Sequence, residues 1–258
     1  MAVGFEIRDQ VAWVTIDRPE RMNAVDRETE ERLEEIWHEI EGNPDLRCAV
    51  LTGAGDRAFS AGADMKAADA VNGLEYWGQA RPHGFGGISL RDGLDIPVIA
   101  RVNGLAMGGG FEMVLGCDIV IAAETAKFAL PEPRVGRLPL DGGMVLLPRL
   151  IPHKIAMGYL LTGRRMSATD AESFGLVNEV VTLENLDEAV DRWVADIKAC
   201  APLSLKAVKH TVGKTAQLNA RDAQALRTPA LVAALQSNDS EEGVLAFREK
   251  RAPVWTGT

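Results

Sequence analysis

Three consecutive glycines form the most informative local pattern in this sequence. They lie in Asn103-Gly104-Leu105-Ala106-Met107-Gly108-Gly109-Gly110-Phe111-Glu112, between a strand expected at 97–102 and a helix expected to include 111–115. Glycine loses more backbone entropy on folding than any other residue, so a run of three needs a reason. One reason is that a ligand approaches the backbone while free N–H groups of a helix N-terminus point at it, which suits a developing oxyanion. The other is a tight turn with close strand–helix packing, and the local sequence does not separate the two.

Two glutamates stand where an acid–base pair could act on such a ligand. Glu112 falls in the first turn of the expected helix, where a carboxylate also complements the helix dipole. Glu132 stands between Pro131 and Pro133, whose rings restrict the backbone and fix the direction of this side chain. Surface solvation is the ordinary role of such residues. Two carboxylates held in different environments nevertheless suit acid–base catalysis.

A second small-residue loop, Ala61-Gly62-Ala63-Asp64-Met65-Lys66, leads into a possible helix. It could supply another backbone N–H donor and a cationic side chain. It fits a plain loop with a helix N-cap equally well.

A glycine-rich turn at 53–58 offers a different interpretation. Gly53-Ala54-Gly55-Asp56-Arg57-Ala58 follows an expected strand and matches GxGxxA, with Glu75 at about the right distance for a ribose contact. Gly62 disfavours the helix that a dinucleotide site needs there, and a hairpin precedes the strand. An ordinary strand-to-loop turn is favoured.

The segment Ala58-Phe59-Ser60-Ala61-Gly62 nearly matches the GxSxG nucleophile elbow of serine hydrolases. Its first glycine is replaced, and neither His153 nor His210 has a context typical of a catalytic triad. A serine hydrolase is therefore disfavoured.

The elements that must position these residues alternate between strand and helix. Runs at 5–7 and 11–16 predict a hairpin. Asp26 precedes a helix on which Leu33, Ile36, Trp37 and Ile40 recur at helical spacing, before Gly42-Asn43-Pro44 ends it. Further strands are expected at 48–51, 97–102, 119–122 and 127–130, with a long, partly helical connection at 64–95. This alternation predicts a layered α/β core at residues 1–185.

A helical C-terminal region is predicted at residues 186–258. The stretch from Leu186 to Phe247 is almost entirely compatible with helix, and Pro202 and Pro229 break it. Its many apolar positions suggest packing against the core or against another subunit.

Composition disfavours several classes of function. A formal net charge of −9, from 28 basic and 37 acidic residues, argues against nucleic acid as a partner, which needs a basic face. Three scattered cysteines and four histidines without HxxxH or His/Cys spacing predict reduced thiols and no metal site. The N-terminus lacks a signal-peptide pattern, and no apolar run reaches the ~18 residues of a membrane span. A cytoplasmic protein without a membrane association is expected.

Five segments, in this order, resemble motifs of the enoyl-CoA hydratase/isomerase (crotonase) family. They are Arg18-Pro19-Glu20-Arg21-Met22-Asn23-Ala24, Ala58 to Lys66, Asn103 to Glu112, Pro131-Glu132, and Leu161-Thr162-Gly163-Arg164-Arg165. The resemblance covers nearly the whole chain and favours a functional role for both glutamates. It implies a spiral of ββα turns with a C-terminal α-helical trimerisation region, and hence a homotrimer or homohexamer.

The resemblance also implies the roles of individual residues. The amides of Ala63 and Gly109 would form an oxyanion hole for the thioester oxygen, and Glu112 and Glu132 would be the catalytic acids and bases. The positions matching substrate or CoA contacts are Met22, Ala24, Ala61, Asp64, Met65, Lys66, Gly108, Pro131, Leu140, Phe247 and Lys250, the last two reaching CoA on a neighbouring subunit.

The implied activity is reversible syn hydration of a 2-enoyl-CoA to a 3-hydroxyacyl-CoA. No cofactor is expected, because the thioester itself acidifies the Cα–H. Phe128-Ala129-Leu130-Pro131-Glu132 and Arg251-Ala252-Pro253-Val254-Trp255 resemble carnitinyl-CoA dehydratases. The alternatives are a Δ3–Δ2 enoyl-CoA isomerase, another CoA-ester reaction of the family (a hydrolase, or a racemase/dehydratase), or a non-catalytic CoA- or RNA-binding relative.

The residues around the acyl group leave one question open. Leu140 stands where some family members carry aspartate or glycine, and Asp141 follows it. If Asp141 turns toward the ligand, an isomerase-type reaction is favoured. Trp77 and Phe85 are candidates for the acyl pocket, and core packing explains them equally well.

Overall fold

The first sheet begins with the predicted hairpin. The structure, a computed structural model, describes residues 2–67 and 73–258. β1 (Val3–Arg8) and β2 (Val11–Ile16) pair antiparallel. β2 then continues in parallel to β3 (Cys48–Gly53), β5 (Val98–Val102), β7 (Ile119–Ala123) and β10 (Glu179–Val181). These strands form a six-stranded sheet in the order β1-β2-β3-β5-β7-β10.

A second sheet consists of shorter strands. It contains β4 (Ala58–Ser60), β6 (Leu105–Met107), β8 (Lys127–Ala129) and β9 (Met166–Ser167), in the order β4-β6-β8-β9. Strands adjacent in sequence alternate between the sheets, because β3, β5 and β7 belong to the first sheet and β4, β6 and β8 to the second. Each pair begins one ββα turn, so the predicted spiral is the observed architecture.

Helix α1 (Arg27–Glu41) follows the hairpin and covers one face of the first sheet. The side chain of Asp26 accepts a hydrogen bond from the Thr29 backbone N–H at 3.0 Å and caps the helix N-terminus. The apolar residues predicted to recur at helical spacing are all buried. Gly42 ends the helix, as the sequence predicts.

The described residues of the connection at 64–95, namely 64–67 and 73–95, contain little regular structure. They form α2 (Gly73–Trp77) and a 3₁₀ turn, η2 (Phe85–Gly87); residues 68–72 lie outside the described part of the chain. The remaining elements before the C-terminal region are η1 (Pro19–Arg21), α3 (Gly109–Leu115), η3 (Glu132–Val135), α4 (Gly143–Leu150), α5 (His153–Thr162), α6 (Ala168–Ser173) and η4 (Leu183–Asn185).

One expectation needs correction. The glycine run does not connect the buried strand β5 directly to a helix, because β6 (Leu105–Met107) lies between them. A three-residue strand is too short to show a period of two, so the sequence pattern cannot indicate it. The correction matters because β6 places the glycines at the end of the second sheet.

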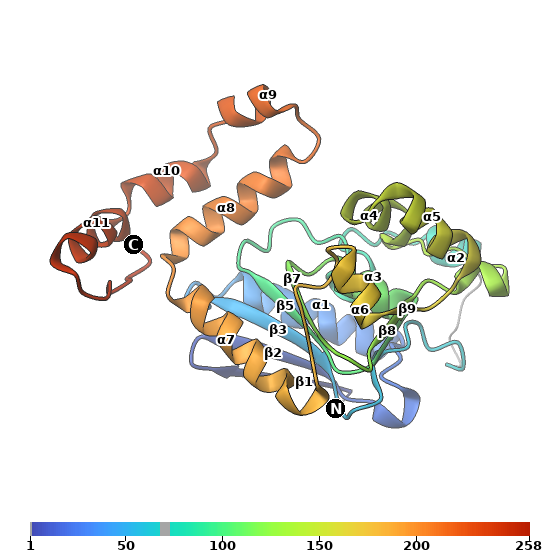
Figure 1. Cartoon of the computed structure of the whole chain (residues 1–258). Helices are drawn as coiled ribbons and strands as arrows, with labels where there is room; N and C mark the ends of the chain where they lie inside the picture. Colours follow the sequence, from blue (N-terminus) through green and yellow to red (C-terminus); the bar gives the residue numbers. More distant parts are fainter. Residues whose placement is uncertain (1, 68–72) are drawn as a thin grey trace.

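The C-terminal region is helical. It consists of α7 (Leu186–Lys198), α8 (Pro202–Thr215), α9 (Ala220–Ala225), α10 (Pro229–Gln236) and α11 (Asn238–Glu249), with Pro202 and Pro229 as first residues of their helices. Helix α7 packs on the face of the first sheet opposite α1. Helices α8 to α11 extend beyond the sheets as an arm (Figure 1). Within the described part of the chain, no helix has the length and apolar character needed to cross a bilayer.

Candidate active site

A cavity of about 1030 Å³ brings together residues from several of the motifs. Nine of the predicted site residues line it: Ala61, Ala63, Met65, Gly108, Gly109, Glu112, Pro131, Glu132 and Leu140. Tyr76, Trp77, Phe85 and Asp141 also belong to its lining.

The second sheet explains why these segments meet. β4, β6 and β8 are neighbouring parallel strands. The 61–66 loop follows β4, the glycine run follows β6, and Pro131-Glu132 follows β8. The carboxyl ends of parallel strands meet at one edge of a sheet, where ligands bind in many α/β folds. Three separate motifs are therefore presented at one place.

The two glycine-containing turns pack directly against each other. A Cβ atom on Gly62, whose φ is +81°, would lie 2.7 Å from the Met107 carbonyl oxygen and 2.9 Å from the Gly109 nitrogen. Only glycine permits this approach. Within residues 2–67 and 73–258, the backbone N–H groups of Ala63 and Gly109 have no hydrogen-bond acceptor. Two unpaired donors from adjoining turns are therefore available to a ligand atom.

Buried amide side chains fix the approach to these turns. The Asn103 Nδ2 donates to the carbonyl oxygens of Gly53 at 2.9 Å and Gly55 at 2.7 Å. The Asn23 Nδ2 donates to those of Ala54 at 3.0 Å and Ala58 at 2.7 Å. Both asparagines are almost completely buried. The turn at 53–58 is followed by β4 and not by a helix. It therefore lacks the helix N-terminus on which a dinucleotide-binding turn depends, which agrees with disfavouring such a site.

Ser60 has a structural role. Its Oγ donates to the Asn23 carbonyl oxygen at 2.8 Å and accepts from the Gly62 backbone N–H at 3.1 Å. The residue has no exposed surface. A buried hydroxyl with both hydrogen bonds made to backbone is not an accessible nucleophile, which agrees with rejecting a serine hydrolase.

Glu112 is buried and held from one side. Its Oε1 accepts hydrogen bonds from the backbone N–H groups of Asp141 at 2.9 Å and Gly143 at 2.8 Å. Burial raises the pKa of this carboxyl from 4.5 to about 8, an effect to which the nearby charges of Asp141 and Glu132 add, while the two amides oppose it. Glu112 therefore retains a proton through neutral pH.

Glu132 lies against the glycine run. A Cβ atom on Gly108, whose φ is +53°, would lie 2.7 Å from the Glu132 Oε1. The buried Oε2 atom has no hydrogen-bond partner in the described part of the chain. Burial raises the pKa of this carboxyl too. The glycine run thus leaves room for a carboxyl group beside the unpaired amides.

Asp141, whose orientation the sequence leaves open, turns inward. It is 7% exposed and lines the cavity. Its Oδ2 accepts a hydrogen bond from the Tyr76 hydroxyl, and its backbone carbonyl accepts one from the Ser89 Oγ at 2.6 Å. Burial raises the pKa of its carboxyl, which Tyr76 and Arg81 oppose. Sequence reasoning gave no reason to expect the contact with Tyr76.

Four of the positions predicted to contact CoA do not belong to the lining of this cavity. Asp64 and Lys66 line a smaller polar pocket of about 370 Å³, and Asp64 also pairs with Arg18 at 3.2 Å. Met22 accepts a hydrogen bond from the Ala61 backbone N–H at 2.9 Å, and Ala24 is buried.

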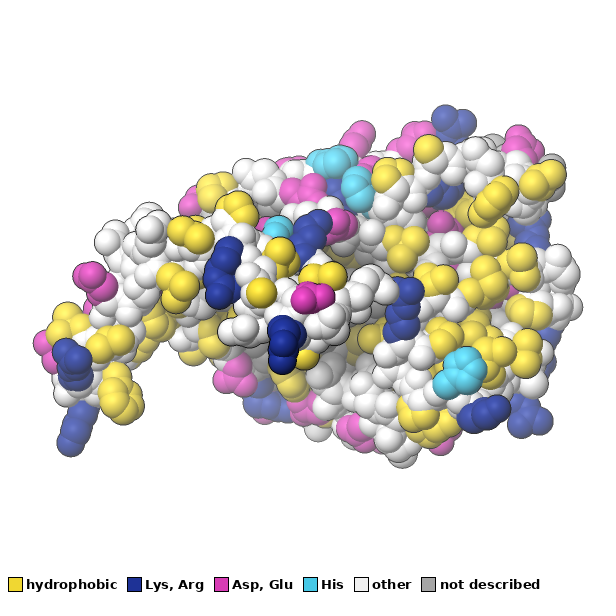
Figure 2. Space-filling model, turned by 90° about the horizontal axis from the view of Figure 1, so that it is seen from above, with side chains coloured by type: hydrophobic (Ala, Val, Ile, Leu, Met, Phe, Trp, Pro, Cys, Tyr) yellow, Lys and Arg dark blue, Asp and Glu magenta, His cyan; other side chains and the backbone are white. Residues whose placement is uncertain are grey.

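Phe247 and Lys250 lie in the arm, separate from both pockets. Phe247 is 86% exposed. Figure 2 shows hydrophobic side chains along the arm, on the left of the view. The exposed apolar residues there include Val208, Val212, Val232, Leu235, Val244, Leu245 and Phe247.

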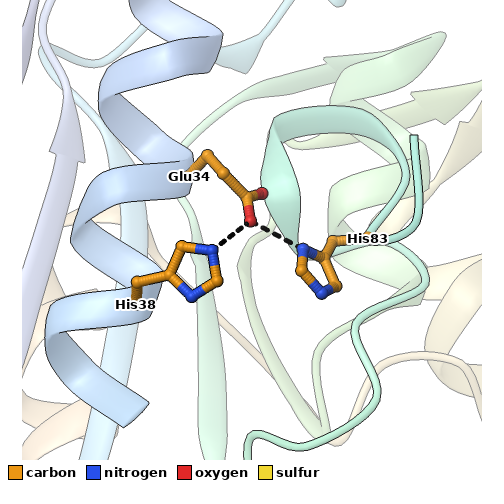
Figure 3. Close-up of side chains that lie close together, drawn as sticks. All are labelled: Glu34, His38 and His83. Carbon is orange, nitrogen blue, oxygen red and sulfur yellow. Dashed lines mark hydrogen bonds and ion pairs between the residues drawn. The ribbon is translucent and has the colours of Figure 1, made fainter. Parts of the chain in front are cut away.

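Two histidines meet in a way that their spacing does not predict. His38 and His83 both contact the Glu34 Oε1, at 3.0 Å and 2.6 Å (Figure 3). The arrangement has the donor types of a metal site. However, the Arg91 guanidinium donates to the Glu34 Oε1 and to the His38 Nδ1, both at 3.1 Å. The Arg91 cation therefore already occupies an oxygen that a metal ion would need, and the His38 Nδ1 also lies 3.3 Å from the Glu41 Oε2. These contacts favour a hydrogen-bonded cluster of charged side chains.

Comparison with known proteins shows the family to which the chain belongs. The family model described as Enoyl-CoA hydratase/isomerase matches residues 6–258. Carnitinyl-CoA dehydratase of Salmonella typhi is 41% identical over 248 residues, 95% of this chain and 94% of the relative. The corresponding protein of Escherichia coli K12 is 40% identical over the same share of each chain.

Solved structures agree over the whole chain. The enoyl-CoA hydratase of Mycobacterium tuberculosis H37Rv superimposes with a TM-score of 0.90 at 34% identity, covering 100% of this chain and 99% of that one. The enoyl-CoA hydratase of Bacillus anthracis gives a TM-score of 0.91 at 32% identity, with both chains fully covered. With its spiral of ββα turns and its family match, this chain belongs to the enoyl-CoA hydratase/isomerase family and is an enoyl-CoA hydratase-like lyase.

Proposed function

We propose that this chain catalyses the reversible syn addition of water to a 2-enoyl-CoA, through a thioester enolate stabilised as an oxyanion. The observation that carries the proposal is that two carboxyls, the buried Glu112 and the half-buried Glu132, line the same cavity as the unpaired amides of Ala63 and Gly109. Each such donor is worth about 3 kcal/mol of transition-state stabilisation.

Each group has one task in this mechanism. The amides of Ala63 and Gly109 hold the thioester oxygen and polarise the conjugated double bond. Glu112 takes a proton from the water that attacks Cβ, and Glu132 gives a proton to Cα. In the reverse direction Glu132 removes the Cα proton and Glu112 protonates the departing hydroxyl. No external cofactor is required, because the enolate charge is carried by the thioester.

The protonation of the two carboxyls fits this cycle. Either direction needs one proton shared by the pair, and the direction decides which carboxyl starts with it. With a pKa of about 8, Glu112 holds that proton at pH 7 in the free protein. This form is ready to release a hydroxyl group as water, as a dehydratase requires.

The relatives suggest a substrate to test first. The proteins at about 40% identity are carnitinyl-CoA dehydratases, and the carnitinyl group combines a 3-hydroxyl with a quaternary ammonium. The cavity lining of this chain includes the Asp141 carboxyl and the aromatic rings of Tyr76 and Trp77. Carboxylates and aromatic faces attract such cations. We therefore propose a 3-hydroxyacyl-CoA with a cationic end as a substrate.

The test is the ultraviolet absorbance of the conjugated enoyl thioester, which falls on hydration and rises on dehydration. Glu112→Gln and Glu132→Gln are each expected to lower kcat by about 100-fold or more, because each removes a proton-transfer group. The matched control Glu184→Gln changes an exposed glutamate of η4 and is expected to retain activity. Full turnover by either active-site variant would remove that residue from the mechanism.

A Δ3–Δ2 enoyl-CoA isomerase is the second candidate, because Asp141 turns into the cavity. An isomerase moves one proton and consumes no water. A 3-enoyl-CoA that gains conjugated absorbance without passing through a 3-hydroxyacyl product would support this reaction. Loss of that gain in Asp141→Asn, with hydration retained, would assign the isomerisation to Asp141.

We further propose that the chain assembles as a trimer or as a pair of trimers. The exposed apolar side chains of the arm support this, since such surfaces usually mark contacts with other chains. In the assembly, Phe247 and Lys250 would reach CoA on a neighbouring subunit. Light scattering at working concentration tests the proposal, and a monomer would refute it.

A further inference from the structure

A second cavity adjoins the proposed acyl site. It measures about 760 Å³ and is lined by charged residues that include Glu30, Glu34, Arg81 and His83. The residues shared by both cavity linings are Ala63, Met65, Tyr76, Phe85 and Arg137. These shared residues form the partition between the two spaces.

Within this partition, the side chain of Tyr76 makes two specific polar contacts. Its hydroxyl donates to the Asp141 Oδ2. The Arg81 guanidinium lies over the tyrosine ring, 4.0 Å from the ring centroid, and pairs with Glu30. The ring is thus fixed at its hydroxyl end and across one face.

The contact with Asp141 links an exposed helix to the floor of the site. Helix α2 has five residues, and none of them is buried. Asp141, by contrast, is fixed through its backbone: its N–H donates to the Glu112 Oε1 at 2.9 Å, and its carbonyl accepts from the Ser89 Oγ at 2.6 Å. One end of the hydrogen bond is therefore held by the backbone of the site, and the other end belongs to an exposed helix.

We propose that Tyr76, held by Asp141 and Arg81, ends the acyl pocket and sets the length of acyl group that the enzyme accepts. A short acyl group stops at the ring. A longer acyl group requires the Tyr76 side chain to break its hydrogen bond with Asp141 and move aside. This movement joins the two cavities. The inference rests on the proposed acyl-CoA site, but it concerns the length of the ligand and not the reaction.

Binding of saturated acyl-CoA thioesters tests the inference without turnover. Calorimetry would compare butanoyl-CoA and decanoyl-CoA on the wild type and on two variants. Tyr76→Ala removes the ring. The ratio of the Kd for butanoyl-CoA to the Kd for decanoyl-CoA is expected to be about tenfold higher in this variant than in the wild type. A tenfold change corresponds to the burial of roughly two further methylene groups. Tyr76→Phe keeps the ring and removes the hydroxyl, so a smaller rise is expected.

Leu150→Ala is the control, since Leu150 is an exposed apolar residue of α4 that lines neither of the two cavities. It is expected to leave the length preference unchanged. An unchanged preference in Tyr76→Ala, in a variant that melts like the wild type and binds butanoyl-CoA, would overturn the inference and leave the proposed function standing. Failure of the wild type to bind any acyl-CoA would overturn both.

Discussion

Replacing Glu112 by glutamine is expected to stabilise the fold, by an amount that grows with pH, while it impairs catalysis. Glutamine has nearly the same shape, and its amide oxygen can accept the two backbone hydrogen bonds that the carboxyl now accepts from Asp141 and Gly143. What it removes is the ionisation of a group that is 3% exposed.

The size of the effect follows from the pKa of Glu112. In the folded protein this pKa is about 8, against an ordinary value of 4.5. Between these values the unfolded chain loses the proton while the folded wild type keeps it, so the free energy of unfolding falls as pH rises. Over the whole interval the loss amounts to about 5 kcal/mol, at about 1.4 kcal/mol per pH unit. The glutamine variant has no such loss.

Calorimetry at pH 5, 7 and 9, at one protein concentration, measures this difference. The melting temperature of Glu112→Gln is expected to lie close to that of the wild type at pH 5 and about 10–20 °C above it at pH 9, because about 5 kcal/mol corresponds to about 2–4 °C per kcal/mol. Glu184→Gln, an exposed counterpart, controls for the general loss of one negative charge. A constant difference from pH 5 to pH 9 would refute the reasoning, because it would mean that the Glu112 carboxyl ionises as it does in the unfolded chain.

Three further predictions follow from the same geometry. The kcat/KM for hydration is expected to fall tenfold per unit above a pH of about 8, where the carboxyl pair loses its last proton, and a stopped-flow pH profile would show this limb. Gly108→Ala places a Cβ 2.7 Å from the Glu132 Oε1 and is expected to lower kcat roughly 100-fold in the absorbance assay; wild-type kcat would contradict that placement. Trp37→Phe removes the 2.9 Å hydrogen bond to the Gly86 carbonyl and is expected to cost about 2 kcal/mol in urea unfolding, whereas an unchanged midpoint would show that this bond contributes nothing.

Local patterns predicted most of the larger elements. The hairpin and α1 follow from alternation, helical spacing and a capping Asp26, which are all properties of neighbouring residues. The longer strands of the first sheet follow from short apolar runs. β4, β6 and β9 have three residues or fewer, too few to display a period, so only the folded chain reveals the second sheet.

The contacts within the site are harder to predict from local sequence than the helices and strands are. The glycine run and the two glutamates carry local signals, and the family resemblance supplied their roles. The hydrogen-bond partners of Glu112 have no local sequence signal. Gly143, for example, is 31 residues away and reaches the carboxyl only because α4 packs against α3. The Tyr76–Asp141 contact spans 65 residues and has no pattern at either end. Contacts of this kind depend on tertiary structure, which single-sequence patterns do not encode.

The order of strands in the second sheet has a consequence for how activity arises during folding. β4, β6 and β8 lie side by side although long stretches of chain separate them, and pairings between distant segments form slowly. The amide donors and the two carboxyls reach their places only when all three strands are in register. Loss of any one of these strands would therefore separate groups that the other two still hold in place, so the proposed site depends on the complete second sheet.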